Sequence, residues 1–181
     1  MGDRVAVLKG GVLQQVDTPK NLYSLPVNAF VAGFIGSPSM NMLEAKLEGG
    51  RLVLPGFTLA VPGAVFDRSP NLRAYDGSSL IVGIRPEDLY DSTLASAAGL
   101  PTVPAQVRTI EELGAEQVVH LGLDAVRVDS GDPDAVQDLS GAANAVARFD
   151  PTSAVRPGQM IDLAVNAEKL HFFNLQTHLA I

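Results

Sequence analysis

The chain has 181 residues, of which 46% are apolar, and it contains no cysteine. This composition allows a sizeable core and excludes a disordered chain, while the lack of cysteine excludes a disulfide framework and a thiolate zinc site and fits a reducing cytoplasm. The formal net charge is −7 and the 13 Lys and Arg residues are scattered, so nucleic acid is not an expected partner.

The N-terminal residues predict a two-stranded ribbon followed by a short helix. Residues 5–8 and 12–16 are β-prone runs separated by Gly10 and Gly11, and glycine supplies the positive φ of a tight hairpin turn. Thr18 before Pro19 is typical of an N-cap and first helical residue, and Pro26 ends that helix. Residues 1–4 lack the apolar stretch of a signal peptide, and no run approaches the ~20 apolar residues of a membrane-spanning helix.

A second short helix is predicted to begin near Asn28 and to have Gly36 as its C′ residue. Phe30, Phe34 and Ile35 form an apolar stripe on it, which could bind a partner but is more typical of core packing. An isolated hairpin is marginal in water, so this region resembles the tail of something larger. We therefore expect two domains, residues 1–38 and residues 39–181.

From Asn41 onward, short apolar or alternating runs are broken by Gly, Pro and Asp about every ten residues, a pattern typical of an all-β barrel or sandwich. The fold class is therefore predicted to be mainly β. Loops are expected at residues 67–77 and 91–99, the second with a helical turn, and the acidic residues 129–141 are expected to separate two strands rather than two domains. The expected strands are residues 41–48, 51–54, 57–61, 79–85, 101–112, 116–123, 125–129, 143–149, 160–165 and 170–174.

Several ordered phrases in this chain resemble those of one protein family. They are the junction Gly-Ser-Pro-Ser-Met-Asn-Met-Leu at residues 36–43, Gly-Ile-Arg-Pro-Glu at 83–87, Glu-Glu-Leu-Gly-Ala-Glu at 111–116 and Lys-Leu-His-Phe-Phe at 169–173. Along its whole length the chain resembles the C-terminal part of the ATP-binding subunit of maltose- and trehalose-type carbohydrate ABC importers. Asn174 departs from the pattern, which usually has aspartate there.

The resemblance implies an OB-like or MOP-like transport-associated (TOBE) β-barrel, preceded by a β-ribbon and short helices from the end of an ABC ATPase domain. It implies a regulatory and dimerisation module that forms a cytoplasmic homodimer through the barrel. The implied partners are a nucleotide-binding domain, transporter membrane subunits at the inner face of the cell membrane, and a regulatory protein or small molecule.

The chain by itself is not expected to hydrolyse ATP. Phosphate binding in such ATPases needs a G-x-x-x-x-G-K-[ST] loop, which the sequence lacks, and the catalytic carboxylate and switch histidine are expected upstream of Met1. No cofactor is predicted for this chain, and ATP and Mg²⁺ would belong to a full-length subunit. Residues 139–142 superficially resemble the LSGGQ signature but lack its second glycine and its glutamine, so a turn is the better interpretation.

Six residues are candidates for interface or structural roles, namely Arg85, Glu87, Glu111, Glu116, His171 and Phe173. If the strand continues through Pro86, Arg85 and Glu87 face the same side, where an ion pair is favoured over a ligand contact. Glu111, Glu112 and Glu116 could be taken for the paired carboxylates of a glycosidase. Charges around a hairpin turn are more often a solvated face.

Two further classes of site are weighed. His120, His171 and His178 are the only histidines, and without a matching carboxylate pattern they predict hydrogen-bonded side chains rather than a metal site. The alternative function is a barrel that binds a small ligand, either a sugar or an oxyanion. Its candidate residues Ser37, Ser39 and Lys46 are generic.

Overall fold

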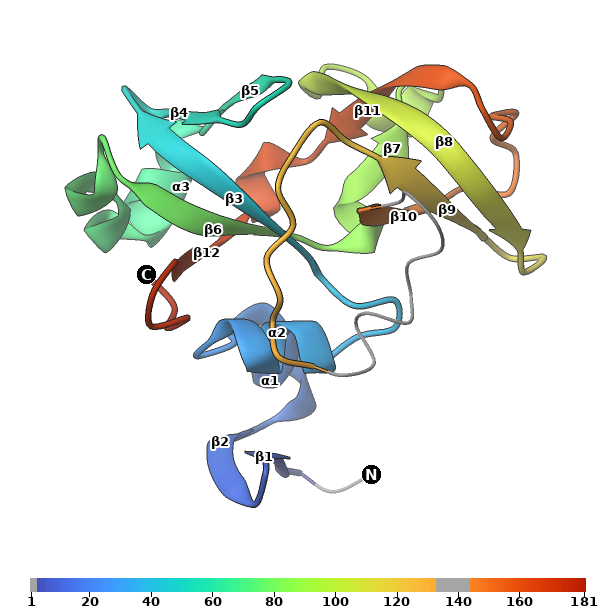
Figure 1. Cartoon of the computed structure of the whole chain (residues 1–181). Coiled ribbons are helices and arrows are strands. Elements are labelled where there is room, and N and C mark those ends of the chain that lie inside the picture. The colour runs from blue at the N-terminus through green and yellow to red at the C-terminus, as the bar shows by residue number, and fades with distance from the viewer. Residues whose placement is uncertain (1–2, 133–143) are drawn as a thin grey trace.

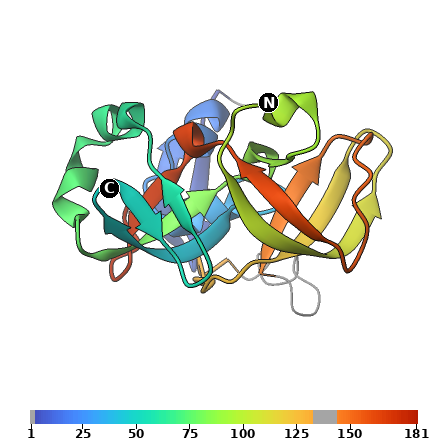
Figure 2. The same cartoon turned by 90° about the horizontal axis from the view of Figure 1, so that it is seen from above.

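Two five-stranded antiparallel sheets form the centre of the computed structural model, which describes residues 3–132 and 144–181 (Figures 1 and 2). The first sheet has the strand order β12–β6–β3–β4–β5, with β3 (Asn41–Glu48), β4 (Arg51–Val53), β5 (Thr58–Ala60), β6 (Ser79–Ile84) and β12 (His171–Asn174). The second has the order β10–β9–β8–β11–β7, with β7 (Leu89–Asp91), β8 (Thr102–Glu112), β9 (Gln117–Gly122), β10 (Ala145–Phe149) and β11 (Met160–Val165).

A single apolar core joins the two sheets. In β3, Leu43, Ala45 and Leu47 are buried while Lys46 and Glu48 are exposed, as expected of a strand with one face toward a core. The same cluster contains fully buried side chains of the second sheet, including Val107, Leu121 and Leu163. The sheets therefore close into a nearly complete barrel, and the predicted mainly β fold of the OB and TOBE type is confirmed.

Three details of the barrel differ from the sequence prediction. The expected loop at residues 67–77 is largely helical, because α3 (Gly63–Arg68) and the 3₁₀ helix η1 (Pro70–Tyr75) bury Val65 and Leu72 against the core. The strand β7 was not predicted. Residues 125–129 are not a strand but carry an isolated bridge between Leu43 and Arg127.

Two further predictions concern the loops at residues 91–99 and 129–141. The helical turn predicted within residues 91–99 is present as η3 (Ala95–Ala97). Another 3₁₀ helix, η4 (Ala167–Lys169), precedes β12. Most of the acidic stretch 129–141, including the residues 139–142 that resemble a signature motif, lies outside the described residues.

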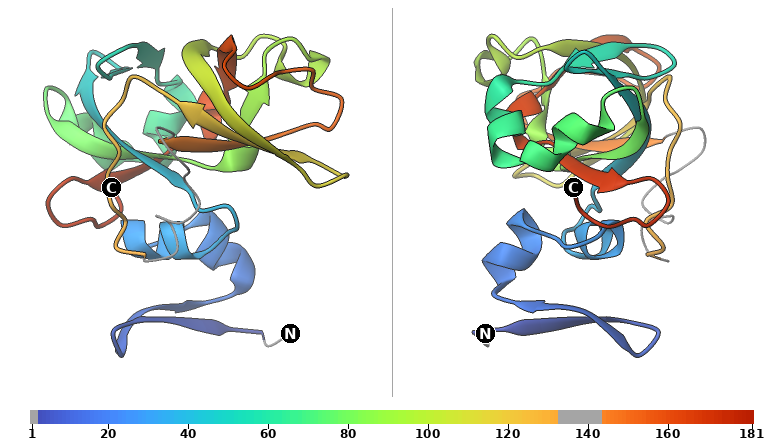
Figure 3. Two further views of the ribbon diagram at one scale, coloured as in Figure 1. Left: turned by 45° about the vertical axis from the view of Figure 1, so that its right-hand side comes forward. Right: turned by 90° about the vertical axis from the view of Figure 1, so that its left-hand side faces the viewer.

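The predicted ribbon and two helices are confirmed as β1 (Val5–Lys9), β2 (Val12–Asp17), α1 (Pro19–Ser24) and α2 (Ala29–Phe34). Thr18 Oγ1 accepts a hydrogen bond from the Asn21 amide at 3.2 Å, and Asn28 Oδ1 accepts one from the Val31 amide at 2.9 Å. Side-chain caps thus start both short helices. The ribbon projects away from the barrel, and the helices lie between them (Figure 3).

Helix α2 is attached to the barrel on two sides. The Val128 amide donates to the Met42 carbonyl. The residues after Val128 then pass so close to α2 that a Cβ atom on Gly33 would lie 2.7 Å from Ser130 Oγ. At the other side, the Ala29 amide donates to the His178 carbonyl. The division at residue 38 stays a prediction, and α2 packs directly against the barrel.

Within residues 3–132 and 144–181, no helix has both the length and the apolar character needed to cross a membrane.

Candidate functional site

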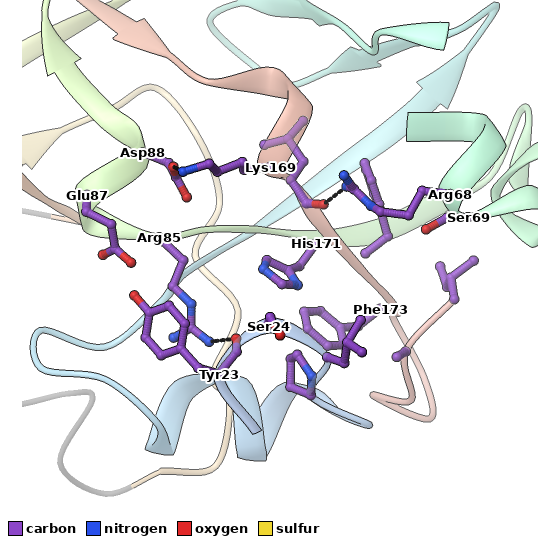
Figure 4. A pocket seen from close by; sticks show the side chains of 16 residues that line it. Tyr23, Ser24, Arg68, Ser69, Arg85, Glu87, Asp88, Lys169, His171 and Phe173 are labelled. Carbon is purple, nitrogen blue, oxygen red and sulfur yellow. Dashed lines mark hydrogen bonds and ion pairs between the residues drawn. The ribbon is translucent and has the colours of Figure 1, made fainter. Parts of the chain in front are cut away.

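The end of β6 meets the C-terminal ends of α1 and α2 at a single buried arginine (Figure 4). Arg85 is 2% exposed. Its guanidinium donates to the carbonyls of Tyr23 at 2.5 Å, Ala32 at 3.2 Å and Ile35 at 2.5 Å. It also lies 3.8 Å from the centre of the Tyr23 ring, a cation–π contact. We call this arrangement the Arg85 junction.

The junction follows from the local sequence. Pro86 has no N–H to donate to a neighbouring strand, so β6 ends at Ile84 and the chain turns into the 3₁₀ helix η2 (Pro86–Asp88). The last carbonyls of a helix have no partner within the helix and carry the negative end of its dipole. A planar guanidinium with several donors satisfies the ends of two helices at once, which a single ammonium cannot do with the same geometry.

The cation at the junction stays charged. Burial lowers the pKa of Arg85 to about 10, while Asp88 opposes that shift. The pKa is still well above neutral, so the guanidinium keeps its proton and holds the three carbonyls.

The predicted ion pair between Arg85 and Glu87 is wrong. Because the strand ends before Pro86, the Arg85 side chain turns toward the helix ends and its bonds go to carbonyls rather than to Glu87. Glu87 is half-buried, and desolvation raises the pKa of its carboxyl group. The interface role suggested for both residues stays a prediction, although burial of Arg85 favours a structural role.

Next to the junction, Asp88 forms an ion pair with Lys169, whose Nζ lies 3.1 Å from Asp88 Oδ1. Asp88 is 4% exposed, and burial raises its pKa although Lys169 acts in the opposite direction. The hydrogen bond to Asp88 in turn raises the pKa of Lys169. This pair links η2 to η4, and both of its residues line the cavity described below (Figure 4).

The closing strand β12 brings two of the predicted residues to the same place. His171 lies opposite Gly83 of β6 and is half-buried. Burial, together with the positive charges of Arg85 and Arg68, lowers the pKa of its imidazole to about 4. The imidazole is therefore neutral at physiological pH. Phe173 is 1% exposed and packs with α2 through Ala29 and Ala32. Phe173 thus belongs to the contact between barrel and helices, and His171 lies on the same strand beside the Arg85 junction.

The remaining candidates, Glu111 and Glu116, lie on and beside the β8–β9 hairpin. Glu111 Oε1 lies 2.8 Å from Nε2 of the buried His120, and Glu116 lies 3.5 Å from the Arg148 guanidinium. Each carboxylate therefore has its own basic neighbour. This arrangement does not resemble two carboxylates facing one scissile bond.

Sequence reasoning missed Asn41, which fastens the two sheets together. Its side-chain amide donates to the carbonyls of Ile84 at 3.0 Å and Val146 at 2.8 Å, and its oxygen accepts from the Val146 amide at 2.7 Å. The only signal in the sequence was a polar residue at the start of the strand, directly before the apolar Met42 and Leu43.

A cavity of about 610 Å³ opens beside the junction (Figure 4). The residues that the structure describes contain no group of three or more His, Asp or Glu side chains placed to hold a metal ion. Lys46, a candidate for oxyanion binding, is exposed on β3 and pairs with Glu48 at 2.6 Å.

Comparison with known families gives two matches on this chain. The MalK OB fold domain matches residues 36–89, and the TOBE domain matches residues 82–173. These ranges meet at β6 and η2, so Arg85 and Glu87 lie in the region that both share.

Curated relatives are ATP-binding proteins of import systems. The chain is 40% identical over its full length to the trehalose/maltose import ATP-binding protein MalK of Thermococcus litoralis and 32% identical over its full length to the oligosaccharides import ATP-binding protein MsmX of Bacillus subtilis. It is 36% identical, over 96% of its length, to the trehalose import ATP-binding protein SugC of Mycobacterium tuberculosis. It spans 45%, 45% and 46% of these relatives, in their C-terminal part.

Proposed function

Because the chain belongs to the TOBE-domain family, in the form found in the C-terminal part of ATP-binding subunits of sugar ABC importers, we propose that it is the regulatory and dimerisation module of such a subunit. The match covers the OB and TOBE region of those subunits and not their catalytic core. Regulation and dimerisation go beyond this match and are part of the proposal.

The observation that carries the proposal is the outer face of the ribbon. Ala6 lies opposite Val16, and Leu8 lies opposite Leu13, so four apolar side chains share one face. Leu8 and Leu13 are 53% and 57% exposed, whereas Val7 on the other face is buried against the helices. A contiguous exposed apolar face marks an interaction surface, and we propose the ATP-binding domain of the subunit as its partner.

The Arg85 junction supports a role in transmitting motion between that domain and the barrel. The ribbon packs on α1 and α2 through Val7, Leu22, Phe30 and Val31, and the two helices are fastened to the barrel through Arg85. A displacement of the ribbon would therefore move the helix ends and the barrel together. This is the mechanical property that a regulatory module needs.

The other roles follow from membership of the family. We propose that the chain itself holds neither ATP nor Mg²⁺, which would bind to the ATP-binding domain of a full-length subunit. We propose further that it lies on the cytoplasmic side of the cell membrane through transporter membrane subunits, pairs with a second copy through the barrel, and receives signals from a regulatory protein or a small molecule.

Sedimentation velocity of the purified chain, combined with calorimetric titration of MgATP, tests the proposal. We expect a reversible dimer and no heat of nucleotide binding. The exposed Leu113 lies at the tip of the β8–β9 hairpin, between the interface candidates Glu111 and Glu116, so Leu113→Glu should weaken the proposed dimer. The matched control is Met160→Glu, because Met160 is similarly exposed on β11.

Two results would contradict the proposal. A chain that stays monomeric at every concentration would remove the dimerisation role. Tight, magnesium-dependent binding of ATP would show that the chain contains the nucleotide site that we assign to another domain.

A further inference from the structure

The cavity beside the Arg85 junction has the size and construction of a small-molecule site. Its volume of about 610 Å³ is within the ~300–1,000 Å³ that is usual for such sites. Its walls come from the end of α1, the end of α3, η2, β12 and the last two residues of the chain. Segments from five places in the sequence thus converge on one hollow (Figure 4).

Every cation that lines this cavity already has partners. Arg68 donates to the carbonyls of Glu168 at 2.6 Å and Leu170 at 3.0 Å. Arg85 is used by the helix ends, and Lys169 is paired with Asp88. A phosphate or sulfate would have to displace one of these partners and would also face the carboxyl groups of Glu87 and Asp88, so the charge pattern disfavours an oxyanion.

The side chains of His171 and Glu87, both in the wall, lack such partners. Among the described residues, the His171 imidazole makes no hydrogen bond, and the Glu87 carboxyl group bonds only to its own backbone amide. His171 projects into the middle of the cavity, with Glu87 on the same side as Tyr23 (Figure 4). A neutral imidazole offers one donor and one acceptor, and a carboxyl group offers acceptors.

Apolar surface makes up much of the remaining wall. The Tyr23 ring lies on one side, and Pro26, Leu170 and Phe173 contribute to the others. A ligand that fits this cavity therefore needs two features. It needs polar groups that both donate and accept hydrogen bonds, and it needs an apolar side made of C–H groups. Hydroxyl groups on a saturated ring have this combination, and they carry no charge.

We propose that this cavity binds an uncharged polyhydroxylated ligand of one or two sugar rings, with hydroxyl groups hydrogen-bonded to His171 and Glu87. The low pKa of His171 is consistent with the proposal, since it keeps the imidazole neutral and able to accept a hydrogen bond. The proposal requires neither dimerisation nor an ATP-binding domain, so it can fail while the proposed function stands.

The test is a titration of the isotopically labelled chain, followed by two-dimensional NMR, with methyl α-D-glucopyranoside, maltose, sodium phosphate and sodium sulfate as separate probes. We expect saturable shifts with the sugars at amides around residues 23–26, 85–88 and 169–173. Saturable shifts at these amides with phosphate or sulfate but not with sugar would overturn the proposal. So would sugar-induced shifts that do not saturate or that fall elsewhere on a folded chain.

Conservative variants identify the groups responsible. Glu87→Gln and His171→Asn should each weaken sugar binding about tenfold, because each removes or alters one hydrogen bond in a partly buried site. The matched controls are Glu112→Gln, on the exposed hairpin, and His178→Asn, at a positive φ of 60° that asparagine tolerates. Equal affinity in all four variants would overturn the assignment to this cavity.

Discussion

The barrel and the ribbon–helix segment are held together by different kinds of interaction. The barrel has one continuous apolar core spanning both sheets, with side chains such as Leu43 and Leu121 fully buried. The ribbon–helix segment has a small cluster of Val7, Leu22, Phe30 and Val31 and leaves the apolar face of the ribbon exposed. The difference indicates that the barrel supplies most of its own stability, whereas the segment depends more on its attachment to the barrel.

The largest expected effect comes from cutting into the barrel core. Leu121→Ala on β9 should lower the free energy of unfolding by about 3–4 kcal/mol, because the side chain is fully buried and leaves a cavity. Leu13→Ala on the ribbon, where the side chain is 57% exposed, should change it by less than about 0.5 kcal/mol. Urea denaturation followed by circular dichroism measures both. Similar losses in the two variants would contradict the comparison.

A second prediction separates the segment from the barrel. Arg85→Met should lower the free energy of unfolding by about 2–3 kcal/mol, because three carbonyls lose their charged donor. Hydrogen exchange should accelerate in α1 and α2, while β8 and β9 keep most of their protection. Arg108→Met, on the exposed face of β8, is the matched control. Uniform loss of protection throughout the barrel would show that Arg85 serves the core rather than the junction.

Acid should weaken the contact between the two regions through His171. The unfolded chain binds the proton near pKa 6.5 and the folded chain near pKa 4, so the unfolded state holds more protons between these values and stability falls as pH falls through that window. Between about pH 7.5 and pH 5, we expect the protonation of His171 to lower the free energy of unfolding by about 2 kcal/mol. His171→Asn should lack it. Parallel pH profiles of the variant and the parent chain would disprove the assignment, since other groups contribute equally to both.

The smallest effect concerns the start of α2. Asn28→Ala should lower the free energy of unfolding by about 1 kcal/mol, because the Val31 amide loses the side-chain oxygen that accepts its hydrogen bond. Asn28→Ser keeps a capping oxygen and should recover most of that loss. Thermal denaturation of the three chains provides the test, and an equal loss in both variants would indicate that the cap contributes little.

The sequence predicted those features that depend on neighbouring residues. Hairpin glycines and the N-cap residues Thr18 and Asn28 identify the ribbon and both helices. The alternation of apolar and polar residues identifies strands such as β3. The short β7 and helix α3 were not predicted, because they are stabilised by contacts with distant parts of the chain rather than by their own pattern.

The site was predicted only in part for the same reason. Arg85, His171 and Phe173 were identified as candidates. The partners of Arg85, however, are backbone carbonyls that lie 50, 53 and 62 positions away in the sequence. Backbone acceptors have no signature in side-chain identity. The ion pair with Glu87 was expected from spacing along a strand, and it failed because Pro86 ends that strand.

The most direct test of the account is binding of an ATP-binding domain to the exposed face of the ribbon. The probe is that part of the Thermococcus litoralis relative which this chain does not cover, titrated with the chain in a calorimeter. We expect saturable binding that the double variant Leu8→Lys/Leu13→Lys weakens by at least about 30-fold, while Met160→Lys on the barrel leaves it unchanged. Absence of binding, or equal affinity of the ribbon variant and the parent chain, would contradict the claim that this face is built to be covered by the ATP-binding domain.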